Sequence, residues 1–358
     1  MKINLLRRTL VVGIILLFIG ISVVPSSGIQ IVEKPIIPCI NGNTLYVGGS
    51  GPGNYSTIQS AVDDANNGDT VFVFDDSSPY FEKIYVNKSI MLVGENRNTT
   101  VIDGSDYHDI LIIQSSNVTI SNFTIQNSKH TGIEVQSNNN NLIIRDNNFL
   151  NNNEDIILEE SCYNFIYNNY FNTNSEHVSI ELGPYSCYNI ISRNIIQNSG
   201  EKGYGMSIRY GSSYNEITFN VFKNNWIGMK LCYDFNIISY NSFESNRKYA
   251  INIFRSLSSS ITCNNFIDNG CMTRYSMVTG KYIFIFSYIF SRQIDYNYWN
   301  DWIGFGPKYI QGKVVIPLYP YDPNSDTYDL PLLSFDWHPV KEPYNITDAS
   351  AIQGCDIE

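Results

Sequence analysis

The sequence is poor in charged residues and has no basic cluster. Only 16% of its 358 residues are charged, and 34 acidic side chains outnumber 23 basic ones, which gives a net charge of −11. Nucleic-acid binding depends on clustered Lys and Arg that neutralise phosphates, so this composition predicts no nucleic-acid partner. Hydrophobic residues make up 43% of the chain, which argues against disorder and predicts a packed core.

The chain also lacks an apolar run long enough for a typical membrane span. Its most apolar segment, residues 10–24, follows the basic residues Lys2, Arg7 and Arg8 and precedes the small residues 26–28. A spanning helix needs about 20 apolar residues, so residues 1–28 are predicted to be a signal peptide, with an N-terminal membrane anchor as the alternative. In both cases we expect the rest of the chain at the cell surface or in the extracellular space, after a linker at residues 29–43.

What the sequence does have is a repeat. The unit Asn-x-(Phe/Ile) recurs in steps of 22, 25, 26, 21 and 23 residues, at Asn147, Asn169, Asn194, Asn220, Asn241 and Asn264. A second unit of alternating apolar residues keeps the same pace, starting at Gly132, Asp155, Ser179, Gly205, Gly228 and Ala250. A third, Asn-x-Ile, lies between them, at Asn164, Asn189, Asn215 and Asn236. Each repeat therefore holds three strand-like pieces separated by polar corners.

The spacing of the apolar residues decides between the repeat architectures. They recur at i and i+2, which is the period of a strand and not of a helix. The leucine grid of leucine-rich repeats is missing. A parallel β-helix remains, in which coils stack at a strand separation of about 4.8 Å. The Phe and Ile of the first unit then form an internal stack, and the Asn columns bond along the corners, where Asn tolerates the left-handed backbone.

Both ends of such a solenoid need a cap. Ser56 with Gln59 resembles a capping box for a short helix that Gly68 ends, and we expect this helix to lie over the first coil. Strands are then predicted at residues 70–74, 84–86, 90–93 and 101–102. At the other end, the apolar run at residues 282–290 is expected to cover the core, with docking to a partner or a membrane as the alternative. Residues 301–358 lose the period, and we expect an irregular tail packed on the solenoid.

These motifs resemble a known family. The segments YSTIQSAVDDA at residues 55–65, GDTV at 68–71 and YVNKSIMLVG at 85–94 are similar to NosD-like right-handed β-helix proteins, which belong to a wider group of carbohydrate-binding proteins and sugar hydrolases. Residues 297–302 and 335–339 resemble the tails of archaeal surface members. The resemblance covers roughly residues 44–300 and implies an all-β, right-handed parallel β-helix of the pectin-lyase-like kind with an N-terminal capping helix. It specifies fold more strongly than function.

Two carboxylates are the candidates for catalysis. Glu134 and Glu181 occupy one repeat position on an outward face, two coils apart with Ile157 between them. Glycoside hydrolases use such a pair of carboxylates, so a polysaccharide lyase or glycoside hydrolase acting on this face is one alternative. A charged column on a solvated strand face is the more ordinary interpretation, and the catalytic signatures of polygalacturonases, pectin esterases and pectate lyases are missing. We therefore assign no catalytic residue and favour a protein that is not an enzyme.

The candidates for ligand binding are aromatic. Tyr163, Tyr188 and Tyr214 stand in one column just before the corner Asn, and Phe235 extends it. Aromatic rings and phenol hydroxyls suit sugars, although an aromatic ladder also stabilises coils. The favoured function is an exported, non-catalytic surface module that binds polysaccharide, a cell-surface glycan or glycoprotein. A structural component of the cell surface with no soluble ligand is a further alternative.

Metal-binding patterns are missing. The seven Cys show no CxxC or Cys/His spacing, which argues against zinc. Copper would need grouped His, Met or Cys, and the sequence pattern assigns no common repeat position to His108, His130, His177 and His338. Cys162 and Cys187 do share a column, where small packed residues are preferred over a disulfide or a soft-metal pair.

One segment begins like a calcium loop. Residues 322–326 have the opening spacing of an EF-hand, but Thr327 stands where Gly is needed and Leu333 where the closing Glu is needed. We therefore predict no metal site and no cofactor. Calcium binding is kept as a possibility that no motif supports.

Overall fold

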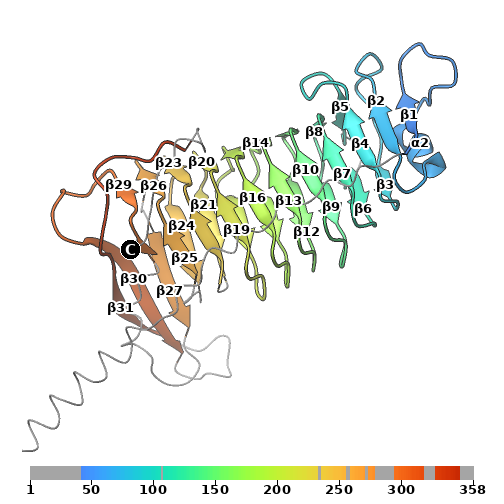
Figure 1. Ribbon diagram of the computed structural model, residues 1–358. Helices are drawn as coiled ribbons and strands as arrows, with labels where there is room; N and C mark the ends of the chain where they lie inside the picture. The colour runs from blue at the N-terminus through green and yellow to red at the C-terminus, as the bar shows by residue number, and fades with distance from the viewer. Residues whose placement is uncertain are drawn as a thin grey trace, which may run out of the picture. The chain divides into compact units, whose positions relative to one another are not determined.

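Each coil of the chain adds one short strand to each of three sheets, and the coils stack side by side (Figure 1). The computed structural model describes residues 42–105, 108–232, 235–254, 259–270, 273–278, 294–317 and 327–346. The predicted signal peptide or anchor, nearly all of the linker, and the apolar run at residues 282–290 lie outside this part of the chain. Within it, no helix has the length and apolar character needed to cross a membrane.

The first sheet, sheet A, begins at the N-terminal end of the coils. Its strands pair in parallel in the order β1 (Thr44–Val47), β2 (Thr70–Val73), β4 (Met91–Gly94), β7 (Thr119–Ser121), β10 (Ile143–Arg145), β13 (Phe165–Tyr167), β16 (Ile190–Ser192), β19 (Glu216–Thr218), β22 (Ile237–Ser239), β25 (Ser260–Thr262) and β28 (Ile294–Asp295). The register steps by one coil at each pairing, so each residue lies beside its counterpart in the coil before.

Sheet B carries the buried aromatic stack. Its strands are β5 (Val101–Asp103), β8 (Thr124–Gln126), β11 (Asn148–Leu150), β14 (Tyr170–Asn172), β17 (Ile195–Gln197), β20 (Val221–Lys223), β23 (Ser242–Glu244), β26 (Asn265–Ile267) and β29 (Tyr298–Trp299).

Sheet C has the longest strands. They are β3 (Ile84–Val86), β6 (Leu111–Ile113), β9 (Thr131–Val135), β12 (Glu154–Leu158), β15 (Val178–Leu182), β18 (Tyr204–Ile208), β21 (Ile227–Leu231), β24 (Tyr249–Phe254), β27 (Thr273–Val278), β30 (Lys308–Pro317) and β31 (Thr327–Asp336). The predicted all-β parallel solenoid is thereby confirmed, and the predicted strands near its N-terminus agree with β2, β3, β4 and β5 within a residue or two.

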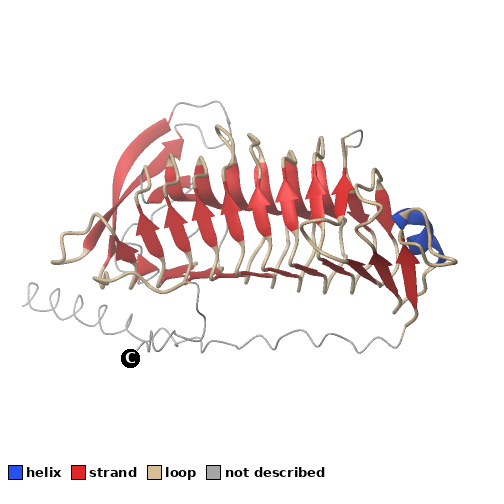
Figure 2. Ribbon diagram, turned by 90° about the horizontal axis from the view of Figure 1, so that it is seen from above, coloured by secondary structure: helices blue, strands red, loops and turns tan. Residues whose placement is uncertain are grey.

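A short helix of about two turns, α2 (Ile58–Asp64), lies at one end of the stack of coils (Figure 2). It buries Ile58, Ala61 and Val62 against the first strands. The predicted capping box was wrong by one residue, because the N-cap is Thr57, whose side chain accepts the N–H of Ser60. The carboxylate of Glu82 also caps the helix from the next coil, since it accepts the N–H groups of Ile58 and Gln59 at 2.9 and 3.0 Å.

The internal stack predicted from the repeat is present. Phe149 and Phe171 lie parallel with ring centroids 4.7 Å apart, and Phe222, Phe243 and Phe266 continue the stack beyond Ile196. All of these side chains are fully buried. Each contributes on the order of 1.5–3 kcal/mol to folding, so the column is a main source of stability.

Buried Asn side chains form ladders along the coils. In the main ladder, the Oδ1 of each Asn accepts both the backbone N–H and the side-chain amide of the Asn one coil earlier, from Asn147 to Asn297. A second ladder links Asn164, Asn189, Asn215 and Asn236 in the same way. These bonds satisfy backbone groups that the sharp corners remove from the sheets.

The C-terminal segment departs from the irregular tail expected after residue 300. Strand β30 pairs in parallel with β27 and antiparallel with β31, so the two extend sheet C by a hairpin. The physical reason is the open edge of β27, whose unpaired N–H and C=O groups β30 satisfies. Pro331 lies in β31, which is an edge strand, the place where a sheet tolerates a residue without an N–H.

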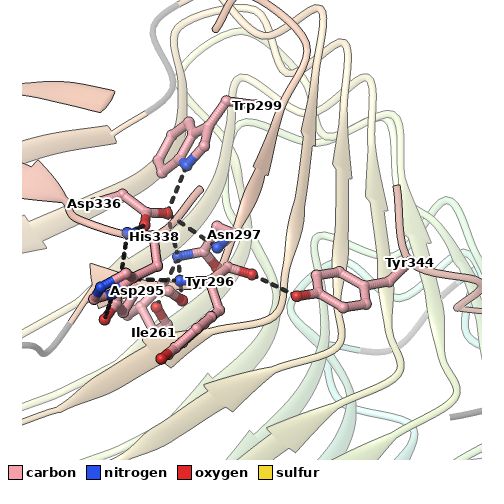
Figure 3. Close-up of polar contacts among 8 residues, drawn as sticks. All are labelled: Ile261, Asp295, Tyr296, Asn297, Trp299, Asp336, His338 and Tyr344. Atoms are coloured by element: carbon pink, nitrogen blue, oxygen red, sulfur yellow. Dashed lines mark hydrogen bonds and ion pairs between the residues drawn. The ribbon is translucent and has the colours of Figure 1, made fainter. Parts of the chain in front are cut away.

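Asp336, the last residue of β31, and the residues that follow it close the last coil (Figure 3). Asp336 is buried and accepts from the backbone of Asn297 and from the indole N–H of Trp299, which itself stacks on Phe266 at 4.2 Å. Further along, the hydroxyl of Tyr344 donates to the carbonyl of Tyr296. The segment thus caps both the Asn ladder and the aromatic stack.

Candidate functional site

The predicted aromatic column stands at the corner between sheets C and A. Tyr163, Tyr188 and Tyr214 are stacked with centroids 5.1 Å apart and planes within 8°, and Phe235 follows at 5.6 Å. Each of the four has a positive φ, between 57° and 61°, which is uncommon for aromatic residues. Between 41% and 53% of each residue's surface remains accessible. The column is therefore a row of rings on the outside of the coils.

Two further tyrosines lie in the same turns, and the sequence repeat did not indicate them. Tyr185 and Tyr210 are 55% and 61% exposed, and their rings meet edge to face at 5.8 Å. Gly211 makes room for Tyr185, because a Cβ there would lie 2.5 Å from its ring. We refer to these six residues, Tyr163, Tyr185, Tyr188, Tyr210, Tyr214 and Phe235, as the aromatic corner.

The stacking decides which part of each ring in the column can meet a ligand. Tyr188 has a parallel ring on both sides, from Tyr163 and from Tyr214, so its two faces are covered. What it presents to solvent is its outer edge and its hydroxyl. Face-to-face stacking of a sugar on Tyr188 is thus excluded, while hydrogen bonding to the phenol remains available.

The candidate carboxylates lie on sheet C. Both Glu134 and Glu181 pair in register with Ile157 of the intervening strand, so they occupy one outward column two coils apart. Desolvation raises the pKa of Glu134, and the nearby carboxylates of Asp109 and Glu159 add to this. Desolvation also raises the pKa of Glu181, against the opposing effect of Arg209, whose Nε lies 2.8 Å from its Oε1. The structure therefore places the two groups on one face, with Glu181 held in an ion pair.

A column of histidines was missed by the sequence reasoning. The carbonyls of His108, His130 and His177 accept the N–H groups of Thr131, Glu154 and Tyr204, each of which begins a strand of sheet C. The three histidines therefore do share one repeat position, and the expectation that they share none was wrong. Asn153 takes the rung between His130 and His177. The spacings of 22 and 47 residues, about one and two repeats, were the available signal.

These histidines alternate with carboxylates. His130 Nδ1 lies 2.8 Å from Asp109, which also pairs with Lys83 at 3.4 Å. Glu154 lies between the two histidines, with 3.9 Å from its Oε2 to His130 Nε2 and 3.6 Å from its Oε1 to His177 Nδ1. The hydrogen bond to Asp109 raises the pKa of His130, and the charge of Glu154 adds to this. The row is thus an alternation of basic and acidic side chains.

A polar pocket of about 640 Å³ opens beside this row, at the corner between sheets B and C. Residues 128–129, 151–153 and 174–177 line it. Volumes of this size are typical of small-ligand sites, but most such sites are lined by apolar side chains. Here the side chains of Asn, Ser, Lys, Glu and His form the whole lining.

The stacked cysteines make hydrogen bonds to the backbone. The N–H of Cys187 donates to the Sγ of Cys162 at 3.2 Å, and the N–H of Ser213 donates to the Sγ of Cys187 at 3.4 Å. Both thiols are free and half-buried. They therefore act as rungs of a polar ladder and not as packed core residues.

No group of three or more His, Cys, Asp or Glu that could hold a metal ion occurs in the part of the chain that the structure describes. The calcium-like segment at residues 322–326 lies outside that part. The described part of the chain therefore offers no ligand set from which a metal site could be assigned.

Comparison with known proteins agrees with the fold. Residues 96–266 match the family model of the right-handed β-helix region, so the solenoid is a right-handed parallel β-helix. No curated protein matches the chain. Solved structures with some likeness are a double mutant of the periplasmic alginate epimerase AlgG and the alginate lyase from Paenibacillus sp. strain FPU-7.

The likeness to those two structures is distant. The epimerase has 13% identity and a TM-score of 0.27, with 64% of this chain and 66% of the epimerase chain covered. The lyase has 10% identity and a TM-score of 0.34, with 66% of this chain and 93% of the lyase covered. Scores this low carry no conclusion about activity, so function is argued from the site alone.

Proposed function

We propose that the protein is an exported β-helix that binds polysaccharide, or the glycan of a glycoprotein, along its aromatic corner without cleaving it. The observation that carries the proposal is the row of exposed rings at that corner. The fold does not require them, because Asn141 occupies the same position one coil before Tyr163, as the matching hydrogen bonds of their N–H groups indicate. Exposed aromatic residues gathered in one place are typical of interaction surfaces.

The covered ring faces suggest how a glycan would bind. Tyr163, Tyr188 and Tyr214 present hydroxyls in a line parallel to the stack of coils. Each phenol can donate and accept a hydrogen bond, which matches the hydroxyls of a sugar chain. A polysaccharide lying along the column would therefore bond to successive phenols and contact the ring edges between them.

The test separates the hydroxyls from the stack. The triple variant Tyr163→Phe, Tyr188→Phe, Tyr214→Phe keeps every ring, and Phe235 already shows that the column accepts Phe. We expect this variant to melt like the wild type and to lose retention on the polysaccharide that the wild type binds, by tenfold or more. Unchanged retention would remove the column from the binding site, and a wild type that no polysaccharide retains would sink the proposed function.

Polysaccharide cleavage is the second candidate. It is favoured by the raised pKa values of Glu134 and Glu181, because a general acid must hold its proton at the working pH. The chain length of acidic and neutral polysaccharides after long incubation, with and without calcium, is the measurement. If the double variant Glu134→Gln, Glu181→Gln still shortens the polysaccharide, the activity lies elsewhere on the protein. If the wild type does not shorten any polysaccharide, binding without cleavage is the function that remains.

The finer assignments have support from the sequence alone. Membership of the NosD-like group, an archaeal source, and a surface-exposed or extracellular location stay proposals, supported by the motifs and by the N-terminal segment 1–28. A purely structural surface component predicts that no soluble glycan binds to either the wild type or the Phe variant.

A further inference from the structure

The polar pocket owes its existence to unequal turns between sheets B and C. Residues 151–153 make a short turn from β11 to β12, whereas residues 173–177 make a longer turn from β14 to β15. The short turn becomes the floor, and the turns of the coils on either side become walls. The coil register therefore builds a hollow at this corner, separate from the aromatic corner at the opposite end of the sheet C strands.

The walls are tied to the floor by hydrogen bonds. Ser175 Oγ donates to Asn153 Oδ1 at 3.0 Å and accepts the N–H of His177 at 3.1 Å. On the other side, the N–H of Asn153 donates to the carbonyl of Ser128 at 3.1 Å. Asn152 is buried beneath the floor, where its Nδ2 donates to Ile125 and to Asp155. The pocket is thus shaped before any ligand enters, which lowers the entropy lost on binding.

The charges around the pocket balance one another. Its lining holds one ammonium, from Lys129, and one carboxylate, from Glu176, together with His177. His177 faces Glu154, which it shares with His130. An anionic ligand would therefore find no excess of positive charge here. The remaining lining groups are the amides of Asn and the hydroxyls of Ser, and each of these kinds of group both donates and accepts hydrogen bonds.

We propose that this pocket is a second carbohydrate site, which takes a neutral sugar unit by hydrogen bonds from its hydroxyls to the Asn and Ser side chains of the floor and the two walls. A sugar hydroxyl also donates and accepts, so it complements an amide better than an anion or an apolar group would. The site rests on the proposed function only in that its ligand is a saccharide. It is distinct in place and in chemistry from the row of phenols.

The test uses two variants of one exposed wall residue and a control from the same side of the solenoid. Asn174→Ala removes an amide that could bond to the sugar. Asn174→Trp fills the pocket and should block the sugar even if its hydrogen bonds are made by other residues. Glu201→Ala changes the corresponding turn of the next coil, whose residues do not line the pocket. Neutral gluco-, manno- and galacto-oligosaccharides and uronic-acid oligosaccharides of equal length are titrated into the full chain by calorimetry.

We expect a neutral oligosaccharide to bind the wild type and the Glu201→Ala variant equally. Its affinity should fall tenfold or more in Asn174→Trp and by a smaller factor in Asn174→Ala. Tighter binding of the uronic-acid series, equal binding by Asn174→Trp, or no binding of any oligosaccharide would overturn the pocket assignment. The triple Phe variant should bind the oligosaccharide like the wild type, so failure of the pocket and failure of the aromatic corner are read separately.

Discussion

The side-chain Oδ2 of Asp336 accepts the backbone N–H of Asn297 at 3.0 Å, and this bond ends the ladder that begins at Asn147 (Figure 3). At earlier rungs an Asn can both accept from one coil and donate to another. Asp336 has no coil to donate to, and both of its oxygens accept: Oδ2 also takes the indole N–H of Trp299 at 2.7 Å, and Oδ1 takes the N–H of His338 at 3.2 Å. An acceptor-only side chain is therefore the one that suits the last rung.

Replacing this carboxylate should loosen the C-terminal cap. In Asp336→Asn, an amide N–H₂ must face one of the N–H donors, so a buried donor loses its partner at a cost of about 1–3 kcal/mol. Burial and the nearby Asp295 raise the pKa of Asp336 to about 7, so urea unfolding is best compared well above that pH. Asp301→Asn, which removes only an exposed ion pair with Lys308, should cost less than about 1 kcal/mol. Equal stabilities of the two variants would contradict this account.

The buried stack can be tested against the exposed one. Phe171→Ala leaves a hole beside Phe149 in the core and should lower the free energy of unfolding by about 3–5 kcal/mol. Phe235→Ala removes the same side chain from the end of the aromatic corner, where half of it already meets solvent, and we expect a loss of about 1 kcal/mol or less. Denaturant midpoints measure both. A Phe171→Ala variant that unfolds like the wild type would mean that the column faces outward.

The N-terminal helix depends on a cap from the neighbouring coil. In Glu82→Ala, the N–H groups of Ile58 and Gln59 lose both carboxylate oxygens, and we expect a loss of about 1–2 kcal/mol. Amide exchange of residues 58–61 should accelerate more than exchange in the central coils, because only this end opens. Glu342→Ala, an exposed residue at the other end of the described chain, serves as the control. If amide exchange at the helix is unchanged in Glu82→Ala, then Thr57 alone provides the N-terminal cap that stabilises the helix.

The repeat made the coils predictable because each repeat position has one structural role, which selects the residue type found there. Phe171 must fill the core, Asn169 must bond between coils, and the spacing of such residues reports the length of a coil directly. The same regularity placed Tyr188 and Glu181 in their columns. Strand residues were therefore predictable almost residue by residue, and so were the candidate sites that lie on strands or beside a corner Asn.

The features that the sequence did not predict are those that do not recur in every coil. The histidine column was hidden because Asn153 takes the rung between His130 and His177, so these two histidines lie two coils apart although their carbonyls make equivalent bonds. The hairpin of β30 and β31 pairs with β27 after an interval that no repeat measures. Glu82 caps a helix more than twenty residues away in sequence, and only the stacking of coils brings the two together.

Asp155, in strand β12, provides a test of a carboxylate buried in the coils. It is fully buried, accepts from Asn152 Nδ2 at 3.0 Å and from the hydroxyl of Thr173, and burial raises its pKa to about 7 from the ordinary 3.8. Because the folded-state pKa lies above the unfolded one, the folded state binds more protons between these values. The stability linked to this group is fully present below pH 3.8 and is lost as the pH rises through about 7.

The variant Asp155→Asn cannot ionise, so it should escape that loss. Its free energy of unfolding should match that of the wild type in acid and exceed it increasingly up to ~pH 8. There the difference reaches the order of a few kcal/mol, at about 1.4 kcal/mol per unit of pKa shift, and the melting temperature rises with it. Thermal unfolding of both proteins at ~pH 4, ~pH 6 and ~pH 8 measures it. Asp146→Asn, a half-buried aspartate beside Arg145, controls for the loss of a negative charge. A variant whose advantage stays constant with pH would mean that the wild-type Asp155 remains ionised in the core, held by Thr173 and Asn152 strongly enough to outweigh its desolvation.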